Sequence, residues 1–402
     1  MTLELSNSLP VDCPDSESDD DSEPASDPKP EPNEAPNTQS DVSDQDPTPF
    51  PEKKEENGEP TQPKTDGDLH IQSVIECDCV VMTCQFSTDG SLLAVGLCNG
   101  TIKVYSTDSG ELTQTLRDNS SVISGLPVTG LRFTCSGNLH HLLLATYASG
   151  CVRCWYVWGG QCVWWLKESK DSEEDEDPQP RESLCLSTSL SGERAVTGGS
   201  DATVHLYDLN TCQRLQVCRA SASKAVMDGH RFRIFAVSFH PERETEFITG
   251  GWDNTVQFWD TRMQHSIRML YGPHVCGDAL HINPASNQIL SGSWRRYNTL
   301  EVWDYDSGRK VFEVPQDPHE NSRIYTCYWS GQDHLIGGGG QANMLRVVNR
   351  HSLETESRLF DLSSAVYSSS VCLSGQWAGL IAASSGKQVF LLHRNQNTKK
   401  HQ

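Results

Sequence analysis

Three side chains near the middle of the chain, His230, Thr249 and Asp253, have the types that a nucleophilic triad uses. In such a triad a hydroxyl attacks the substrate, a histidine takes its proton and a carboxylate orients the histidine. That chemistry requires the three groups to meet at an open cavity. Thr249 is instead expected on a strand, with its hydroxyl inside the protein, so the sequence favours a buried structural cluster of the same three residues.

Two cysteine pairs have spacings that metal and redox sites use. Cys151 and Cys154 lie in a run typical of a strand, where side chains three apart point to opposite faces, and Cys77 and Cys79 have no second group of ligands. The run from Gly337 to Gly340 is followed by neither Lys-Ser/Thr nor a helix, so it is not a phosphate loop. Without a nucleophile elbow or a dinucleotide fingerprint, the sequence predicts no metal, no cofactor and no enzymatic activity.

Acidic residues are concentrated in two segments of this chain of 402 residues, whose formal net charge is -22. Residues 1–68 carry 20 acidic and 4 basic side chains, and residues 169–182 carry 7 and 2. The first segment is rich in Pro, Ser, Asp and Glu, which predicts a disordered acidic tail, and we interpret the second as a disordered acidic insertion. Since the remainder is nearly neutral, nucleic acid is not an expected partner.

The sequence also predicts a location. Fifteen cysteines would suggest disulfides in a secreted protein, but the N-terminus lacks the basic and apolar stretches of a signal peptide. A reducing compartment is therefore expected. No run of about 18 apolar residues is present, so no membrane span is expected. We expect a monomer in the cytoplasm or the nucleus.

A repeat begins at residue 69. Short runs of Val, Ile, Leu, Cys and aromatic residues are separated by turn dipeptides such as Asp89-Gly90 and Asn99-Gly100, which is typical of short antiparallel strands. Aligning similar runs gives seven copies, at 101–105, 151–155, 203–207, 255–259, 299–303, 344–348 and 388–392. Each copy spans about 45 residues, the length of a four-stranded propeller blade.

Two copies end in Trp-Asp, at residues 259–260 and 303–304, and one begins with Gly229-His230. With these features the chain resembles the WD-repeat family over residues 69–395. The resemblance implies an all-β, seven-bladed WD-repeat β-propeller between the acidic tail and a polar C-terminal tail at 396–402. Blades are expected at about 76–117, 118–168, 183–222, 225–272, 274–316, 321–360 and 361–395. The last copy has three clear strands, so residues 69–75 are expected to add its outer strand and close the ring.

The family resemblance also implies a buried tetrad of a His, a Ser or Thr, an Asp and a Trp in each complete blade. Only blade four matches in full, with His230, Thr249, Asp253 and Trp259. Blade three has Thr197, Asp201 and Tyr207 without the Gly-His, and blade five has Ser291, Trp303 and His274, with Arg295 in place of the acid.

In this family the connections between blades and the turns between second and third strands share one face. That face would hold five arginines, two tryptophans and a tyrosine from three adjacent blades: Arg231, Arg233, Trp252, Trp294, Arg295, Arg296, Tyr297 and Arg323. Arg and Trp are typical of interaction hot spots, and the guanidinium group binds carboxylates and phosphates. The alternative is that these arginines are only solvated and the tryptophans pack against neighbouring blades.

An acidic or phosphorylated peptide is the ligand class that suits such a face. Ser16, Ser18 and Ser172 each have an acidic residue three positions later, which makes them candidate phosphorylation sites. The acidic tail either competes for the basic face or only solubilises the chain.

We therefore expect a non-catalytic scaffold or adaptor for protein–protein interaction. As an alternative, Trp259, Asp260 and Arg262 resemble the W-D-x-R ending through which WD-repeat substrate receptors contact the adaptor of cullin-type ubiquitin ligases. The alternative from another class is an enzyme with its site in the propeller channel. That site would need paired carboxylates or a cluster of histidines.

Overall fold

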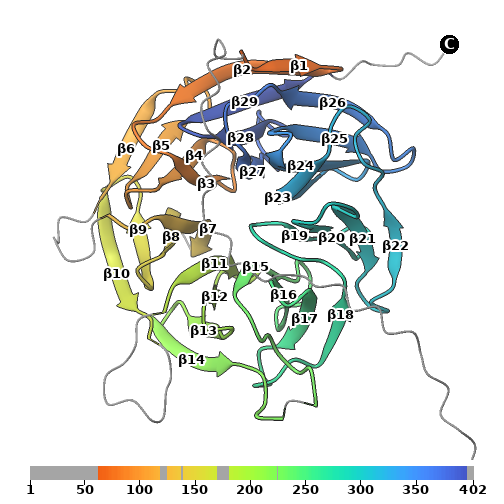
Figure 1. The fold of residues 1–402 in the computed structure, drawn as a ribbon. Coiled ribbons are helices and arrows are strands. Elements are labelled where there is room, and N and C mark those ends of the chain that lie inside the picture. Colours follow the sequence, from red (N-terminus) through yellow and green to blue (C-terminus); the bar gives the residue numbers. More distant parts are fainter. Residues whose placement is uncertain (1–61, 118–124, 137–138, 170–180, 224, 396–402) are drawn as a thin grey trace, which may run out of the picture. The chain divides into compact units, whose positions relative to one another are not determined.

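The computed structural model describes residues 62–117, 125–136, 139–169, 181–223 and 225–395. The chain up to residue 61, the candidate phosphorylation sites Ser16, Ser18 and Ser172, and residues 396–402 lie outside this described part. Within the unit formed by residues 58–402, seven antiparallel sheets surround a common axis (Figure 1). The all-β, seven-bladed propeller predicted from the repeat is thus confirmed. No helix of the described residues is long and apolar enough to cross a membrane.

The first three blades follow one another along the chain. Blade one contains β3 (Val81–Phe86), β4 (Leu92–Leu97), β5 (Ile102–Ser106) and β6 (Leu112–Leu116). Blade two contains β7 (Val128–Ser136), β8 (Leu139–Tyr147), β9 (Cys151–Tyr156) and β10 (Gln161–Lys167). Blade three contains β11 (Ser183–Thr188), β12 (Arg194–Gly199), β13 (Val204–Asp208) and β14 (Gln213–Cys218).

Blades four to seven continue the same pattern. Blade four contains β15 (Ile234–Phe239), β16 (Glu246–Gly251), β17 (Thr255–Asp260) and β18 (Arg268–Tyr271). Blade five contains β19 (Leu280–Asn283), β20 (Gln288–Gly292), β21 (Leu300–Asp304) and β22 (Lys310–Glu313). Blade six contains β23 (Ser322–Ser330), β24 (His334–Gln341), β25 (Leu345–Asn349) and β26 (Thr355–Phe360). Blade seven contains β27 (Val366–Val371), β28 (Ile381–Ser385) and β29 (Gln388–Arg394).

The N-terminal strands close the ring. β2 (Leu69–Glu76) pairs with β29 as the outer strand of blade seven, as predicted (Figure 1). β1 (Lys64–Asp66) pairs with β26 and gives blade six a fifth strand. The predicted tail boundary at residue 68 is therefore wrong. Residues 64–66 are polar, and their strand is held by backbone pairing and by ion pairs such as Asp66 with Arg358 at 2.8 Å, which no hydrophobic pattern reveals.

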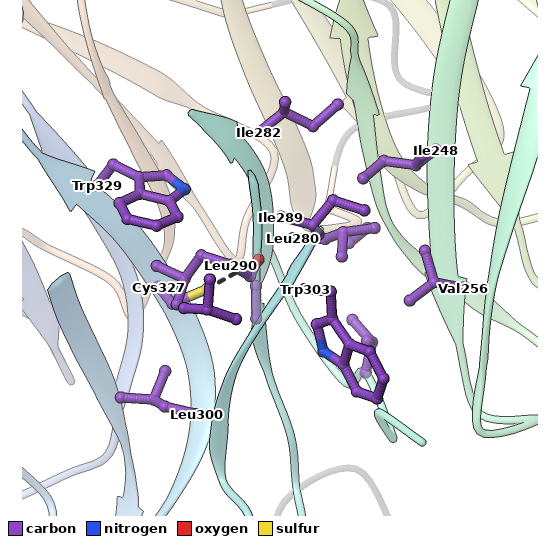
Figure 2. Packing of buried hydrophobic residues seen from close by; sticks show 14 of the residues in the cluster. Ile248, Val256, Leu280, Ile282, Ile289, Leu290, Leu300, Trp303, Cys327 and Trp329 are labelled. Atoms are coloured by element: carbon purple, nitrogen blue, oxygen red, sulfur yellow. Dashed lines mark hydrogen bonds between the residues drawn. The ribbon is translucent and has the colours of Figure 1, made fainter. Parts of the chain in front are cut away.

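Apolar side chains pack between neighbouring blades as well as within them. Figure 2 shows this core around blade five, where Ile248 and Val256 of blade four and Cys327 of blade six lie around side chains of β20 and β21. Cys327 Sγ also donates to the carbonyl of Leu290 at 3.9 Å. Because each blade shares its core with the next, removal of one large side chain weakens two blades.

The glycine run of blade six lies in β24 and has a packing role. A Cβ on Gly337 would lie 2.7 Å from Leu300 of blade five, and a Cβ on Gly339 would lie 1.9 Å from the carbonyl oxygen of Arg323. Any side chain would force β23, β24 or blade five to move, so only glycine fits at these positions.

Candidate functional site

Each blade is an antiparallel meander, so the turns between second and third strands lie on the same side of the ring as the connections between blades. We call this side the top face. It carries the turns after β16 and β20 and the connections before β15, β19 and β23.

Blade four holds the four residues predicted to form a tetrad. Trp259 Nε1 donates to Thr249 Oγ1 at 2.7 Å, and His230 Nε2 lies 2.7 Å from the same hydroxyl. His230 Nδ1 lies 2.8 Å from Asp253 Oδ2. Since a carboxylate only accepts, Nδ1 carries the proton and the Thr249 hydroxyl donates to Nε2. Thr249 and Trp259 are fully buried, so this hydroxyl cannot reach a substrate and the cluster serves the fold.

Asp253 connects the tetrad to the top face. It accepts from the backbone N–H of Arg231 at 3.0 Å and from the Thr255 hydroxyl at 2.8 Å. Burial alone would raise the pKa of Asp253, but the bond from His230 holds this pKa below its usual range. The carboxylate therefore stays charged and fixes both the turn after β16 and the chain that precedes β15.

Blade three holds a different cluster in the equivalent place. Thr197 and Tyr207 occupy the strand positions of the tetrad hydroxyl and indole. Both donate to the carboxylate of Glu168, Thr197 at 2.5 Å, and the hydroxyl of Ser183 donates to its other oxygen. Glu168 comes from the end of blade two and thus replaces the missing histidine.

Arg181 balances the acids of this cluster. Its Nε lies 3.5 Å from Glu168 and 3.5 Å from Asp201, and its Nη2 donates to the carbonyl of Thr203 at 3.0 Å. The side chains of Arg181 and Glu168 are completely buried. The predicted insertion of residues 169–182 is therefore too long, because its last two residues belong to blade three. The segment 170–180 lies outside the described residues.

The charges of this cluster follow from burial and neighbours. Burial alone would raise the pKa of Glu168, but the charge of Arg181 holds it well below its usual range. Burial and the charge of Glu168 raise the pKa of Tyr207, which remains a phenol that donates. Burial and the nearby Arg181 lower the pKa of His205, whose Nδ1 lies 3.2 Å from the Tyr207 hydroxyl. At neutral pH the cluster therefore contains one buried cation, two acids and a neutral histidine.

On the top face, Arg231 braces the connection before blade four. Its guanidinium donates to the carbonyls of Ser221 at 3.3 Å, Ser223 at 2.8 Å and Val226 at 3.0 Å. This use differs from the partner-binding role predicted for Arg231, because the loop occupies both terminal nitrogens of the guanidinium.

Trp252 lies at the centre of an aromatic stack. It stacks on Phe235 with ring centroids 5.3 Å apart and on His274 at 6.3 Å. The guanidinium of Arg233 lies 5.8 Å from the centroid of the Trp252 ring, and its Nη1 donates to Glu182 at 3.2 Å. The stack places Arg233 at the surface with its side chain about half exposed.

Asn254 joins the turns of blades four and five. Its carbonyl oxygen lies 3.0 Å from His274 Nδ1 and accepts from Arg295 Nη2 at 2.9 Å. Burial, followed by the charge of Arg295, lowers the pKa of His274. In blade five Trp303 Nε1 donates to Ser291 Oγ at 3.0 Å, and the ring of His274 is bonded to blade four instead. His274 is thus part of the top face, which corrects its predicted place in a tetrad.

The turn of blade five is held by its backbone and leaves its side chains outside. The carbonyl of Arg296 accepts from the side-chain amides of Gln316, at 2.7 Å, and Asn321. The side chains of Arg296 and Tyr297 are exposed, with the guanidinium 5.6 Å from the ring centroid. This turn therefore presents a cation and an aromatic ring from a fixed position.

A second stack continues the row into blades six and seven. The guanidinium of Arg323 lies 4.3 Å from the ring centroid of Trp294, which is 6.5 Å from that of Tyr325. Tyr325 lies 5.0 Å from Tyr367 by ring centroids. Trp252 and Trp294 thus pack against neighbouring aromatic rings, as the alternative predicted, and an arginine lies over each of them.

An ion pair crosses the centre of the ring. Arg132 Nη2, from inner strand β7 of blade two, donates to both carboxylate oxygens of Asp278, just before β19 of blade five, at 3.0 and 3.2 Å. Tyr328 donates to Asp278 at 3.3 Å, and the ring of His281 lies 4.0 Å from that of Tyr328. Burial alone would raise the pKa of Asp278, but the charge of Arg132 holds it below its usual range. Asp278 is therefore a charged carboxylate that is paired with Arg132 across the centre of the ring.

The family assignment follows from these seven blades together with sequence matches. The family model "WD domain, G-beta repeat" matches residues 71–106 and 221–260, the second of which contains the complete tetrad. This chain belongs to the WD-repeat β-propeller family.

Similar proteins span several functions. The chain is 27% identical to a guanine nucleotide-binding protein subunit beta of Arabidopsis thaliana, over 66% of this chain and 71% of that protein. It is 25% identical to cilia- and flagella-associated protein 52 of Chlamydomonas reinhardtii, over 59% of this chain and 34% of that protein. It is 24% identical to WD repeat-containing protein slp1 of Schizosaccharomyces pombe, over 61% of this chain and 45% of that protein. A chain in a crystal structure of a mitotic checkpoint complex matches 86% of this propeller protein, with a TM-score of 0.65 and 16% identity, which indicates the fold alone.

On the opposite face of the WD-repeat ring, the turn after β17 carries the W-D-x-R residues. Arg262 Nε donates to Asp260 at 2.8 Å, and its side chain is 75% exposed. Trp259 and Asp260 are buried, so among these three only Arg262 offers its side chain to a partner.

The cysteines of the propeller show no metal geometry in the part of the chain that the structure describes. Groups of three or more His, Cys, Asp or Glu side chains that could hold a metal ion are not found there. Cys151 and Cys154 are both buried and free, and Cys77 Sγ lies 3.7 Å from the Tyr105 hydroxyl.

Sequence reasoning missed the charged residues that bridge blades. Glu168 and Arg181 flank an acidic run, so in the sequence they look like part of it. Arg132 and Asp278 are 146 residues apart in the chain. One signal was available for the first pair: blade three has Thr197 without a histidine, which implies that another group must satisfy its hydroxyl.

Proposed function

We propose that this chain is a non-catalytic scaffold that binds acidic or phosphorylated segments of other proteins on its top face. WD-repeat propellers typically serve as platforms for protein interaction, and their relatives among the beta subunits and cilia-associated proteins are generally non-catalytic. The similar solved chain is itself part of a multi-protein assembly, the mitotic checkpoint complex. Acidic peptides as ligands are our own addition to this general role.

The observation that carries the proposal is the row of arginines and aromatic rings from blade four to blade six. Arg233 lies over Trp252, Arg295 is bonded to the turn of blade four, and Arg323 lies over Trp294. Stacking and hydrogen bonds fix these side chains before a ligand arrives, which lowers the entropic cost of binding. Guanidinium groups held in this way suit carboxylates and phosphates.

Exposed apolar groups lie on the same segments as the cations. Phe232 is 61% exposed next to Arg233, and Tyr297 is 61% exposed next to Arg296. A ligand with acidic and apolar side chains would therefore contact both kinds of group. Aromatic residues and arginines together are the usual composition of an interaction hot spot.

A peptide-binding assay tests this proposal. The probe is a labelled peptide with the sequence of residues 15–22, Asp-Ser-Glu-Ser-Asp-Asp-Asp-Ser, phosphorylated at both inner serines, and it is added to the full chain at low ionic strength. The variant Arg233→Glu/Arg296→Glu should weaken binding at least about tenfold, since each lost charge-assisted bond costs about 1.5–3 kcal/mol. Arg309→Glu, an exposed arginine on the opposite face, is the matched control. Equal binding by wild type and the double variant would contradict the proposal.

A second candidate function rests on the exposure of Arg262. We propose as an alternative that this chain is a substrate receptor of a cullin-type ubiquitin ligase and contacts the propeller adaptor through this residue. Arg262→Ala should then abolish co-purification with the adaptor, while Arg309→Ala should not. Co-purification that survives Arg262→Ala would reject this alternative.

A further inference from the structure

Glu182 lies beside one of the arginines offered to an acidic ligand. Arg233 Nη1 donates to Glu182 Oε2 at 3.2 Å, and the two side chains are 48% and 46% exposed. Glu182 belongs to the connection before blade three, whereas Arg233 belongs to the connection before blade four. A carboxylate of the chain itself therefore already contacts this guanidinium.

Both partners of this pair project from fixed backbone. The N–H of Glu182 donates to Ser200 Oγ at 3.1 Å, its carbonyl accepts from the N–H of Ser200 at 3.0 Å, and its neighbour Arg181 is fully buried. The carbonyl of Arg233 accepts from the N–H of Trp252 at 3.1 Å. The carboxylate and the guanidinium are thus kept close to each other by rigid neighbours.

The contact is nevertheless easy to replace. Only one hydrogen bond joins the two groups, and both face solvent, which makes such a pair weak. A ligand carboxylate or phosphate can take two nitrogens of a guanidinium in parallel, and a bidentate pair of this kind is stronger. An incoming acidic group can therefore exchange with Glu182 and leave the rest of the top face unchanged.

We propose that Glu182 is an internal competitor for the top face, which occupies Arg233 in the free protein and is displaced by an acidic or phosphorylated peptide. This inference rests on the proposed function, and the charge of the row selects an acidic peptide as the occupant. Glu182 lowers the affinity of the top face for its ligands, because each ligand must first replace one carboxylate. Ligands with a single weak acid are then disfavoured relative to phosphorylated or multiply acidic ones.

The test is a double-mutant cycle with the phosphorylated peptide of residues 15–22 and the full chain. Glu182→Gln should tighten binding about two- to fivefold, the range expected from release of one half-exposed ion pair. Glu313→Gln is the matched control, because this carboxylate is also half exposed and paired, with Lys310 on the outer strand of blade five. It should leave the affinity unchanged. In an Arg233→Gln background, Glu182→Gln should have no effect.

The possible outcomes separate this inference from the proposed function. If Arg233→Gln weakens binding but Glu182→Gln does not tighten it, the competitor role is overturned and the top-face function stands. If Glu182→Gln tightens binding equally with and without Arg233, the effect is that of general charge, and the inference is again overturned. If Arg233→Glu/Arg296→Glu binds like wild type, the proposed function fails and the competitor role fails with it.

Discussion

In blade four the buried hydroxyl of Thr249 is bonded to the imidazole ring of His230, whereas in blade three the hydroxyl of Thr197 is bonded to the carboxylate of Glu168. The surrounding strands have the same register in both blades. Both clusters also contain an acid at the following turn, Asp253 in one and Asp201 in the other. The clusters differ in the group that bridges the hydroxyl and the turn, and in the ring of the third strand, because Tyr207 donates to Glu168 whereas Trp259 donates to Thr249.

A carboxylate in place of the histidine requires a cation nearby. Glu168 and Asp201 would repel each other in a buried place, and Arg181 lies 3.5 Å from both. Glu168 and Arg181, which flank the acidic segment, thus link the hydroxyl to the acid of the turn in blade three, as His230 alone does in blade four. The tetrad position thus tolerates a different bridging group, provided that the hydroxyls are satisfied and the buried carboxylate has a cation beside it.

The largest expected effect comes from removing the cation of blade three. Arg181→Met leaves Glu168 buried without its counter-charge, which should lower the free energy of unfolding by about 3–5 kcal/mol. Urea unfolding followed by tryptophan fluorescence measures the loss. Arg309→Met, at an exposed arginine, should change stability by less than about 0.5 kcal/mol. If Arg181→Met cost no more than this control, the charge account of blade three would be wrong.

A second variant distinguishes lost charge balance from lost packing. Glu168→Gln/Arg181→Met keeps an oxygen that accepts from Thr197, Ser183 and Tyr207 but removes both charges. We expect it to recover more than half of the stability lost in Arg181→Met, because the uncompensated charge is gone. If no stability were recovered, the aliphatic part of the arginine side chain, and not its charge, would stabilise the blade.

In blade four the corresponding change should cost less, because no net charge is left behind. Thr249→Val preserves shape but leaves the indole N–H of Trp259 and Nε2 of His230 without the hydroxyl. We expect a loss of about 2–3 kcal/mol, since a buried group left unsatisfied costs about 1–3 kcal/mol. Thr115→Val on the exposed side of β6 is the control and should be nearly neutral. If the loss of stability were larger than in Arg181→Met, the predicted order of the two effects would be wrong.

The repeat explains why so much of this fold could be predicted. Seven copies of one strand pattern each indicate the same kind of blade. The last copy lacks an outer strand, which predicts that β2 takes this place. The tetrad of blade four was also visible, because its residue types are specific. β1 was not predictable, since its three residues pair through backbone and charge and carry no alternation of apolar and polar side chains.

Contacts between blades limited what could be predicted of the candidate site. The alignment placed Arg231, Arg233 and Arg295 on one face, but it could not reveal that Arg231 binds loop carbonyls or that Arg233 meets Glu182. Glu182 comes from the connection before another blade, and a loop carbonyl can belong to any residue type, so neither partner leaves a pattern in the sequence. The same holds for Arg132 and Asp278, which meet only after the ring has closed.

Blade five provides an intermediate case between the two clusters. Trp303 donates to Ser291 at 3.0 Å, and His274 is bonded to Asn254 of blade four. The Ser291 hydroxyl has one further bond, a long one to the carbonyl of Glu301 at 3.4 Å. Ser291→Ala should therefore cost only about 1 kcal/mol, the value of one good hydrogen bond, in the same unfolding assay. Thr115→Val is again a suitable reference for a change at an exposed strand position. A loss as large as in Thr249→Val would contradict the assignment of a single strong bond to Ser291.

The smallest expected effect is on the pH dependence of stability, and it comes from His205 of blade three. The pKa of His205 is lowered in the folded chain by burial and by Arg181, so the unfolded chain binds this proton more readily. Stability is then lost as the pH falls through the unfolded value of about 6.5. His205→Gln keeps a donor for the Tyr207 hydroxyl but cannot titrate, so its melting temperature should fall less than that of wild type between about pH 7.5 and 5.5. His351→Gln, at a side chain that is 73% exposed, should keep the wild-type slope. If His205→Gln also kept that slope, the histidine would not be held neutral in the folded chain.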